Sequence, residues 1–127
     1  MNYILDTHTV IWFLNGDDKL SKKSKEIIEN LENLKLVSIA TIWEIAIKKS
    51  LGKFKFDKGF KQFLDLIEDN GFEIVPLTFD HALTVSTLDF IHRDPFDRLI
   101  ISQALTDNLI IITKDEYIEK YDVKTTW

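Results

Sequence analysis

The sequence contains no cysteine, little glycine or proline, and no long apolar run. The absence of cysteine excludes disulfide bonds, thiolate zinc sites and cysteine nucleophiles. Four glycines and two prolines in 127 residues argue against a disordered or loop-rich chain. No apolar stretch approaches the length of a membrane span, and no basic segment precedes the first one. We therefore expect a cytoplasmic protein without a signal peptide.

Several catalytic motifs are also missing. Neither a glycine-rich phosphate loop nor a Gly-x-Ser-x-Gly nucleophile elbow occurs, and three scattered histidines make a zinc site improbable. What is present is a 45% hydrophobic content with nine phenylalanines and three tryptophans, enough for a substantial core. We predict a single domain that spans residues 1–127.

The charge of the chain is unevenly distributed. The net charge is −5, yet residues 48–61 hold six lysines against one acid, Asp57, so that this segment carries +5 and the remainder −10. A basic segment beside acidic residues suits a protein that holds a polyanion near a bound metal. The simpler interpretation of any one of these lysines is a solvated surface residue.

Apolar runs alternate with amphipathic segments, which is typical of βαβ units and a mostly parallel sheet covered on both faces. The expected strands are Tyr3–Leu5, Leu36–Ile39, Ile74–Leu77, Leu109–Thr113 and a short edge strand near Val123. The expected helices are Thr9–Leu14, Lys22–Leu34, Thr41–Leu51, Phe60–Asn70, Asp80–Leu88 and Pro95–Leu105. Gly52 and Gly71 follow two of these helices, where a left-handed residue ends a helix at little cost.

Four acids fall at equivalent places in this pattern. Asp6 and Asp115 follow strands, whereas Glu44 and Asp97 lie near the beginnings of helices. Strand C-termini and helix N-termini lie on the same edge of a parallel sheet. Because gathered carboxylates repel one another, a divalent cation is the first hypothesis for this edge.

Each acid also has a structural explanation. Asp6 follows a buried strand and can cap the next helix, with Thr7 able to order its carboxylate or a metal-bound water. Thr41 and Glu44 have the spacing of a capping box. His8 is more simply a solvated residue than an acid–base group.

The later acids have similar alternatives. Asp94 is a suitable N-cap before Pro95, and Asp97 then lies in the first helical turn. Asp115 can cap a helix that starts near Glu116. For Arg98 the favoured role is a surface salt bridge. No single acid is decisive, and only the shared edge points to a common site.

These segments resemble the PIN-domain family, and within it the stand-alone bacterial VapC-type toxins. The matching segments follow in family order: Ile4–Thr7, Ser38–Ala46, Asp94–Leu99 and Thr113–Asp115. The resemblance implies a three-layer α/β/α sandwich with four to five strands. It also implies an endoribonuclease that uses Mg²⁺ or Mn²⁺, forms a homodimer and is paired with an antitoxin in a type II toxin–antitoxin system.

The resemblance assigns roles to particular residues. The catalytic and metal-binding acids would be Asp6, Glu44 and Asp97, with Asp115 as a more variable fourth. Supporting residues would be Thr7, Asp94 and Thr113. We expect Lys48, Lys49 and Arg98 to contact phosphates of the RNA substrate.

Two other functions remain open from the sequence. One is a protein-binding module with the same fold and weak catalysis, with an apolar surface built from aromatic residues: Trp12, Phe13, Phe54, Phe56, Phe60 and Phe63. Core packing is the simpler role of most of these aromatics. The other is a metal-dependent phosphatase or DNA nuclease on a similar sheet.

Overall fold

The computed structural model describes all residues from Met1 to Trp127 and contains one sheet of five parallel strands. The strands are β1 (Asn2–Leu5), β2 (Leu34–Ser38), β3 (Glu73–Val75), β4 (Ile110–Ile112) and β5 (Thr125–Thr126). Their order across the sheet is β3-β2-β1-β4-β5. The prediction of a parallel sheet is therefore confirmed, and β1 lies at its centre.

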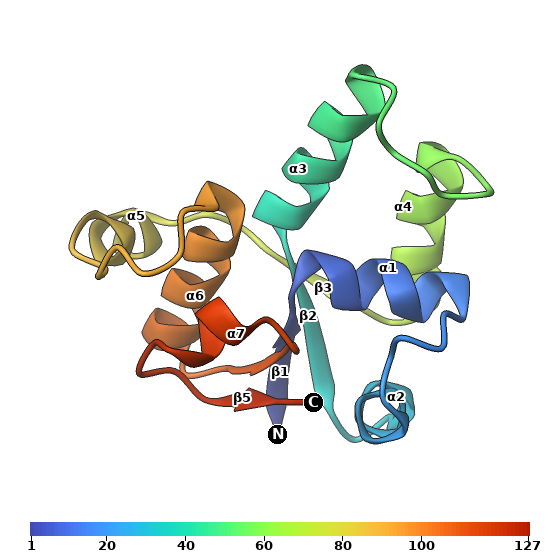
Figure 1. Cartoon of the computed structure of the whole chain (residues 1–127). Helices are drawn as coiled ribbons and strands as arrows, with labels where there is room; N and C mark the ends of the chain where they lie inside the picture. Colours follow the sequence, from blue (N-terminus) through green and yellow to red (C-terminus); the bar gives the residue numbers. More distant parts are fainter.

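Helices cover both faces of the sheet, as the three-layer prediction requires (Figure 1). One side carries α1 (Thr7–Asn15), α2 (Lys22–Glu29), α3 (Ile39–Ser50) and α4 (Phe60–Asp69). The other side carries α5 (Phe79–Ser86), α6 (Pro95–Asp107) and the short α7 (Glu116–Glu119). None of these helices has the length and apolar character needed to cross a membrane.

Alternation along the strands divides the core in two. On β1, Tyr3 and Leu5 pack with α1, α3 and α4, whereas Ile4 between them packs with α6 and α7. Successive side chains of a strand point to opposite faces, so a strand buried on both sides reads as a continuous apolar run. The sheet therefore holds the ends of β1, β2 and β4 in fixed positions.

The predicted helix Lys22–Leu34 is wrong in its second half. Helix α2 ends at Glu29, Leu31 is 92% exposed, and Leu34 begins β2. The polar turn that follows explains the end of the helix, because the Asn30 side chain accepts a hydrogen bond from the Glu32 amide. The spacing of apolar residues predicted a longer helix because it carries no information on this hydrogen bond between a side chain and the backbone.

The boundary between β2 and α3 is also earlier than predicted. Helix α3 begins at Ile39, and the Ser38 hydroxyl caps it by accepting a hydrogen bond from the Ala40 amide. The expected capping box of Thr41 and Glu44 is therefore wrong, and Glu44 lies in the second turn. Gly52 follows the helix with φ +71°, as predicted.

The edges of the sheet are shorter than the apolar runs. Strand β3 ends before Pro76, which has no amide hydrogen to donate to a ladder. The edge strand near Val123 lies slightly later, at Thr125–Thr126. Most of the aromatic set named as a possible partner surface packs instead on the core: Phe13, Phe54, Phe56, Phe60 and Phe63.

Candidate metal and catalytic site

Asp6 follows β1 and is the N-cap of α1, so its capping role is confirmed. Its Oδ1 accepts hydrogen bonds from the Thr9 amide at 2.9 Å and the Thr9 hydroxyl at 2.6 Å. Its Oδ2 accepts a hydrogen bond from the Thr113 hydroxyl, at the end of β4. Burial raises the pKa of Asp6, and the bonds from Thr113 and Thr9 oppose this rise.

Glu44 reaches the same edge from α3 and is buried. The Thr7 hydroxyl donates a hydrogen bond to its Oε1 at 2.8 Å, and Thr41 lies 3.0 Å from that hydroxyl. The Lys48 ammonium lies 3.0 Å from Oε2. Thr7 therefore orders Glu44, and the expectation that it orders Asp6 is wrong; Thr9 and Thr113 perform that role.

Asp97 lies in the first turn of α6, where Asp94 is the N-cap and Pro95 the first helical residue, as predicted. Asp94 Oδ1 accepts hydrogen bonds from the amides of Phe96 and Asp97. Asp94 thus fixes the start of the helix that carries Asp97.

Asp115 is the N-cap of α7, and its Oδ1 accepts hydrogen bonds from the Tyr117 and Ile118 amides. The predicted cap of a helix near Glu116 is therefore confirmed. The Asp115 amide donates to the Thr113 hydroxyl at 3.0 Å. Because that hydroxyl donates to Asp6, a single side chain links the ends of β1 and β4.

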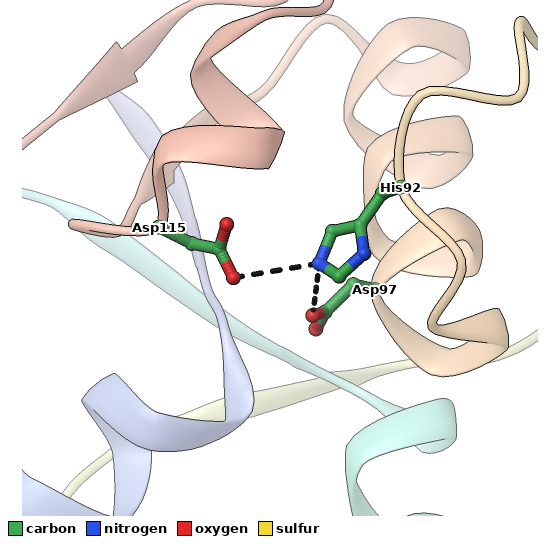
Figure 2. Close-up of side chains that lie close together, drawn as sticks. All are labelled: His92, Asp97 and Asp115. Carbon is green, nitrogen blue, oxygen red and sulfur yellow. Dashed lines mark ion pairs between the residues drawn. The ribbon is translucent and has the colours of Figure 1, made fainter.

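His92 is a site residue that the sequence did not reveal. Its Nε2 lies 2.9 Å from Asp97 Oδ2 and 3.4 Å from Asp115 Oδ2, so the ring stands between the two carboxylates (Figure 2). The Asp94 amide donates to His92 Nδ1 at 3.2 Å. The only hint in the sequence is its position two residues before an N-cap acid.

That hydrogen bond assigns the proton of the imidazole ring. Because Nδ1 accepts from the Asp94 amide, the neutral ring carries its hydrogen on Nε2, the atom that faces Asp97 and Asp115. His92 thus presents a proton donor to the carboxylates. Nε2 also lies within 4.8 Å of one carboxylate oxygen of Asp97 and one of Asp115, so a metal ion that displaced this hydrogen could bind all three side chains.

The electrostatics of the site favour a bound cation. Burial raises the pKa of Asp97 to about 8. The charges of four neighbouring acids contribute to this rise: Asp94, Asp6, Glu44 and Asp115. Negative charge is therefore in excess around Asp97, and carboxylate oxygens are the ligands that Mg²⁺ and Mn²⁺ prefer. The donor set fits a hard divalent cation.

The basic residues near the site differ in their surroundings. Lys48 pairs with Glu44, whereas Lys49 is exposed. Arg98 forms no ion pair, so the expected surface salt bridge is wrong. Its guanidinium donates to the carbonyls of Leu88 at 3.2 Å and Asp89 at 3.0 Å, and stacks 4.5 Å from the Phe90 ring. These contacts fasten the segment that leads to His92.

Two hollows flank the carboxylates. One is lined by Ile91, His92, Arg93, Asp94 and Tyr117. The other is lined by Asp6, His8, Trp12, Lys114 and Asp115. The first hollow therefore adjoins the segment that leads to Asp97, and the second adjoins Asp6 and Asp115.

Comparison with known protein families gives one match: the sequence profile of the PIN domain matches residues 3–124. A comparison with functionally curated sequences found no match.

Solved structures with a similar fold include toxin–antitoxin proteins. A chain of VapBC2 from Rickettsia felis, solved bound to a DNA fragment from its promoter, has a TM-score of 0.75 and 18% identity, with 99% of this chain and 98% of that chain covered. A toxin–antitoxin complex from Klebsiella pneumoniae has a TM-score of 0.67 and 16% identity, with coverage of 98% and 96%. The PIN domain endonuclease Utp24 has a TM-score of 0.53 and 16% identity, with coverage of 93% and 74%. At these identities the likeness establishes the fold.

Proposed function

Since the chain belongs to the PIN-domain family, we propose that it is a metal-dependent endoribonuclease and the toxin of a type II toxin–antitoxin pair. PIN domains are generally nucleases, and the endonuclease Utp24 shares the fold. The observation that carries the proposal is that the charges of Asp6, Glu44 and Asp115 all act on the partly buried Asp97, whose pKa is raised to about 8 by burial and by these and other acids.

The chain's own residues prepare this site for a phosphodiester. Asp6, Glu44, Asp97 and Asp115 would hold a Mg²⁺ or Mn²⁺ ion, which when bound acts as a Lewis acid on water and on phosphate oxygens. Buried threonine hydroxyls fix two of the acids: Thr7 orders Glu44, and Thr9 and Thr113 order Asp6. Such fixed orientation reduces the reorganisation that the reaction requires.

His92 also has a place in this mechanism. Its Nε2 hydrogen faces Asp97 and Asp115 and partly balances their charge. We assign it the role of a positioning residue, because it acts through the two carboxylates. RNA phosphates would approach from the exposed side, where Lys114 lines the hollow beside Asp6 and Asp115.

The test is cleavage of RNA by the purified protein, with Mn²⁺ or Mg²⁺ and with EDTA. We expect cleavage only with metal, and a loss of about 100-fold or more in Asp97→Asn, which keeps the shape of the side chain and removes its charge. Asp122→Asn, at an exposed acid outside the site, is the matched control. Equal cleavage by wild type and Asp97→Asn would indicate a contaminating nuclease and reject the proposal. Cleavage of DNA alone would favour the DNA nuclease.

An apolar stripe on α3 supports a homodimer. Ile39, Trp43 and Ile47 on α3 and Leu51 at its C-cap are spaced four residues apart and are exposed by 36–62%. Side chains at this spacing share one helix face. An exposed stripe of this kind is typical of an interaction surface, and a two-fold axis would place it against the same stripe of a second copy.

Sedimentation velocity tests this surface. We expect the wild type to be a dimer and Trp43→Glu to be a monomer, because a buried unpaired carboxylate at the centre of the stripe is costly. Leu31→Glu is the matched control, since Leu31 is 92% exposed and lies outside the stripe. A dimeric Trp43→Glu would reject this surface, and a monomeric wild type would reject the homodimer.

The proposed antitoxin is the product of a small neighbouring reading frame. The fold shared with VapBC2 and with the Klebsiella pneumoniae toxin–antitoxin complex supports this partner. Expression of the wild type is expected to stop bacterial growth, whereas Asp97→Asn is expected to be harmless. Co-expression of the neighbouring frame should restore growth and yield a complex that purifies together. Growth arrest by both variants would contradict a toxin that acts by cleavage.

A further inference from the structure

Two aromatic rings stand beside the carboxylates on α1. His8 and Trp12 are one helical turn apart, with ring centroids separated by 5.6 Å and ring planes inclined by 31°. His8 is exposed and Trp12 is partly buried. Because α1 begins directly after Asp6, these rings are held at a fixed distance from the site.

Trp12 does not pack in the hydrophobic core, unlike its neighbours on α1. Val10 is part of the core, and Ile11, Phe13 and Leu14 pack against it, whereas Trp12 points elsewhere. Its aromatic neighbours are the His8 ring and the edge of Trp127, whose centroid lies 5.9 Å away. The largest side chain of α1 is therefore turned toward the site's rim.

Positive charge accompanies these rings. The Lys114 ammonium lies 5.1 Å from the centroid of Trp12, and that of Lys19 lies 5.9 Å away. Lys114 stands between Thr113 and Asp115 in the sequence, so it borders the acids directly. The hollow of about 220 Å³ on this side is lined by two rings, one lysine and two acids: His8, Trp12, Lys114, Asp6 and Asp115.

We propose that His8, Trp12 and Lys114 form a subsite for an unpaired nucleobase of the RNA, adjacent to the phosphate over the carboxylates. This subsite rests on the proposed ribonuclease function. Bases of single-stranded nucleic acids stack on aromatic side chains, while lysines follow the backbone charge. A base in a duplex has no free face, so the subsite selects single-stranded RNA.

The competing role of Trp12 is structural, as an anchor between α1 and Trp127. That role requires an aromatic ring for stability, yet it gives no reason for RNA binding to depend on the bases. The two roles are therefore separated by comparing two ligands that differ only in bases. A short oligo(A) and the abasic ribose-phosphate chain of the same length carry the same phosphates.

Binding is measured in the Asp97→Asn background, which prevents cleavage, by fluorescence anisotropy with Mg²⁺ present. We expect oligo(A) to bind about 10-fold more tightly than the abasic chain, the size of one base–aromatic stack. In Trp12→Leu and in His8→Ala, the ratio of the affinity for oligo(A) to that for the abasic chain should fall toward one. Trp12→Phe, which retains a ring, should keep most of it. Lys114→Ala should weaken both ligands equally.

Phe79→Leu is the matched control, since this ring is 95% exposed on α5, and its ratio should equal that of the background. Thermal melts establish that each variant is folded. An unchanged ratio in a folded His8→Ala and Trp12→Leu would overturn the subsite. If the unmodified protein cleaves RNA with metal but the affinity ratio is one, the subsite is rejected while the ribonuclease function stands. Absence of any RNA cleavage would instead reject the ribonuclease function.

Discussion

The hydroxyl of Thr113 donates a hydrogen bond to Asp6 Oδ2, although 107 positions separate the two residues in the chain. The contact exists because β1 and β4 are parallel neighbours in the sheet, so that their C-terminal ends lie side by side. The same hydroxyl accepts from the Asp115 amide. One threonine thus joins two of the four acids.

Thr113→Val is expected to destabilise the protein by about 1–3 kcal/mol, because the shape is kept while buried Asp6 loses a donor and the Asp115 amide loses its acceptor. Urea unfolding at neutral pH measures this loss. Thr113→Ser retains the hydroxyl and should lose less. A valine variant as stable as the serine variant would show that the hydrogen bonds contribute little.

His92→Asn is expected to lower the cleavage rate by about 10–100-fold, the usual effect of removing an outer partner of a metal-binding group. The asparagine can still accept from the Asp94 amide, but it has no donor at the position of Nε2. His92→Gln places an amide nitrogen nearer that position and should retain more activity. Calorimetric titration with Mn²⁺ provides a second measurement, and equal metal affinity and rate in wild type and His92→Asn would contradict the positioning role.

In EDTA, the wild type should lose stability as the pH rises from about 4 to about 8. The pKa of Asp97 is raised from 3.8 to about 8 by burial and by the neighbouring acids. The folded protein therefore holds a proton that the unfolded chain releases, and the associated stability, on the order of a few kcal/mol, is complete below pH 4 and lost through pH 8. Thermal melts across this range measure the effect.

Asp97→Asn provides the control for this pH dependence, because asparagine has the shape of the protonated acid and does not ionise. Its melting temperature should vary less between pH 5 and pH 9 and exceed that of the wild type at the alkaline end. Addition of Mn²⁺ should reverse the alkaline loss in the wild type and release protons. Parallel pH profiles of the two proteins in EDTA would contradict the raised pKa.

Replacement of Lys48 or Lys49 by alanine should weaken RNA binding and reduce its dependence on salt. Removing one lysine that binds a phosphate lowers the slope of log K against log salt by about 0.7 for single-stranded nucleic acid. Lys61→Ala is the control, since Lys61 is exposed on α4 and pairs with Asp65. Slopes that match the wild type at several salt concentrations would exclude both lysines from the RNA-binding surface.

The sequence was sufficient for the architecture and for placing the four acids at strand ends and helix starts. The order of apolar runs predicted a parallel sheet, and the position of each acid after a strand or at a helix start predicted a shared edge. Three helix caps predicted for single acids, at Asp6, Asp94 and Asp115, are also present. A carboxylate can therefore cap a helix with one oxygen and face the site with the other.

Element boundaries were predicted less well. The end of α2 at Glu29 and the start of α3 at Ile39 are set by hydrogen bonds of Asn30 and Ser38 side chains. Hydrophobic spacing continues past both points, because it records burial and not the local competition between side chains and backbone.

The sequence by itself determined the order of strands and helices, and with it the edge where the acids gather, since periodicity and connection handedness fix that edge locally. Only the tertiary structure decided which groups from other parts of the chain surround the acids: Thr113 on Asp6, Thr7 on Glu44, His92 between Asp97 and Asp115. Their choice depends on the packing of the folded chain, because distances of a few ångströms between elements are not encoded in spacing along the sequence.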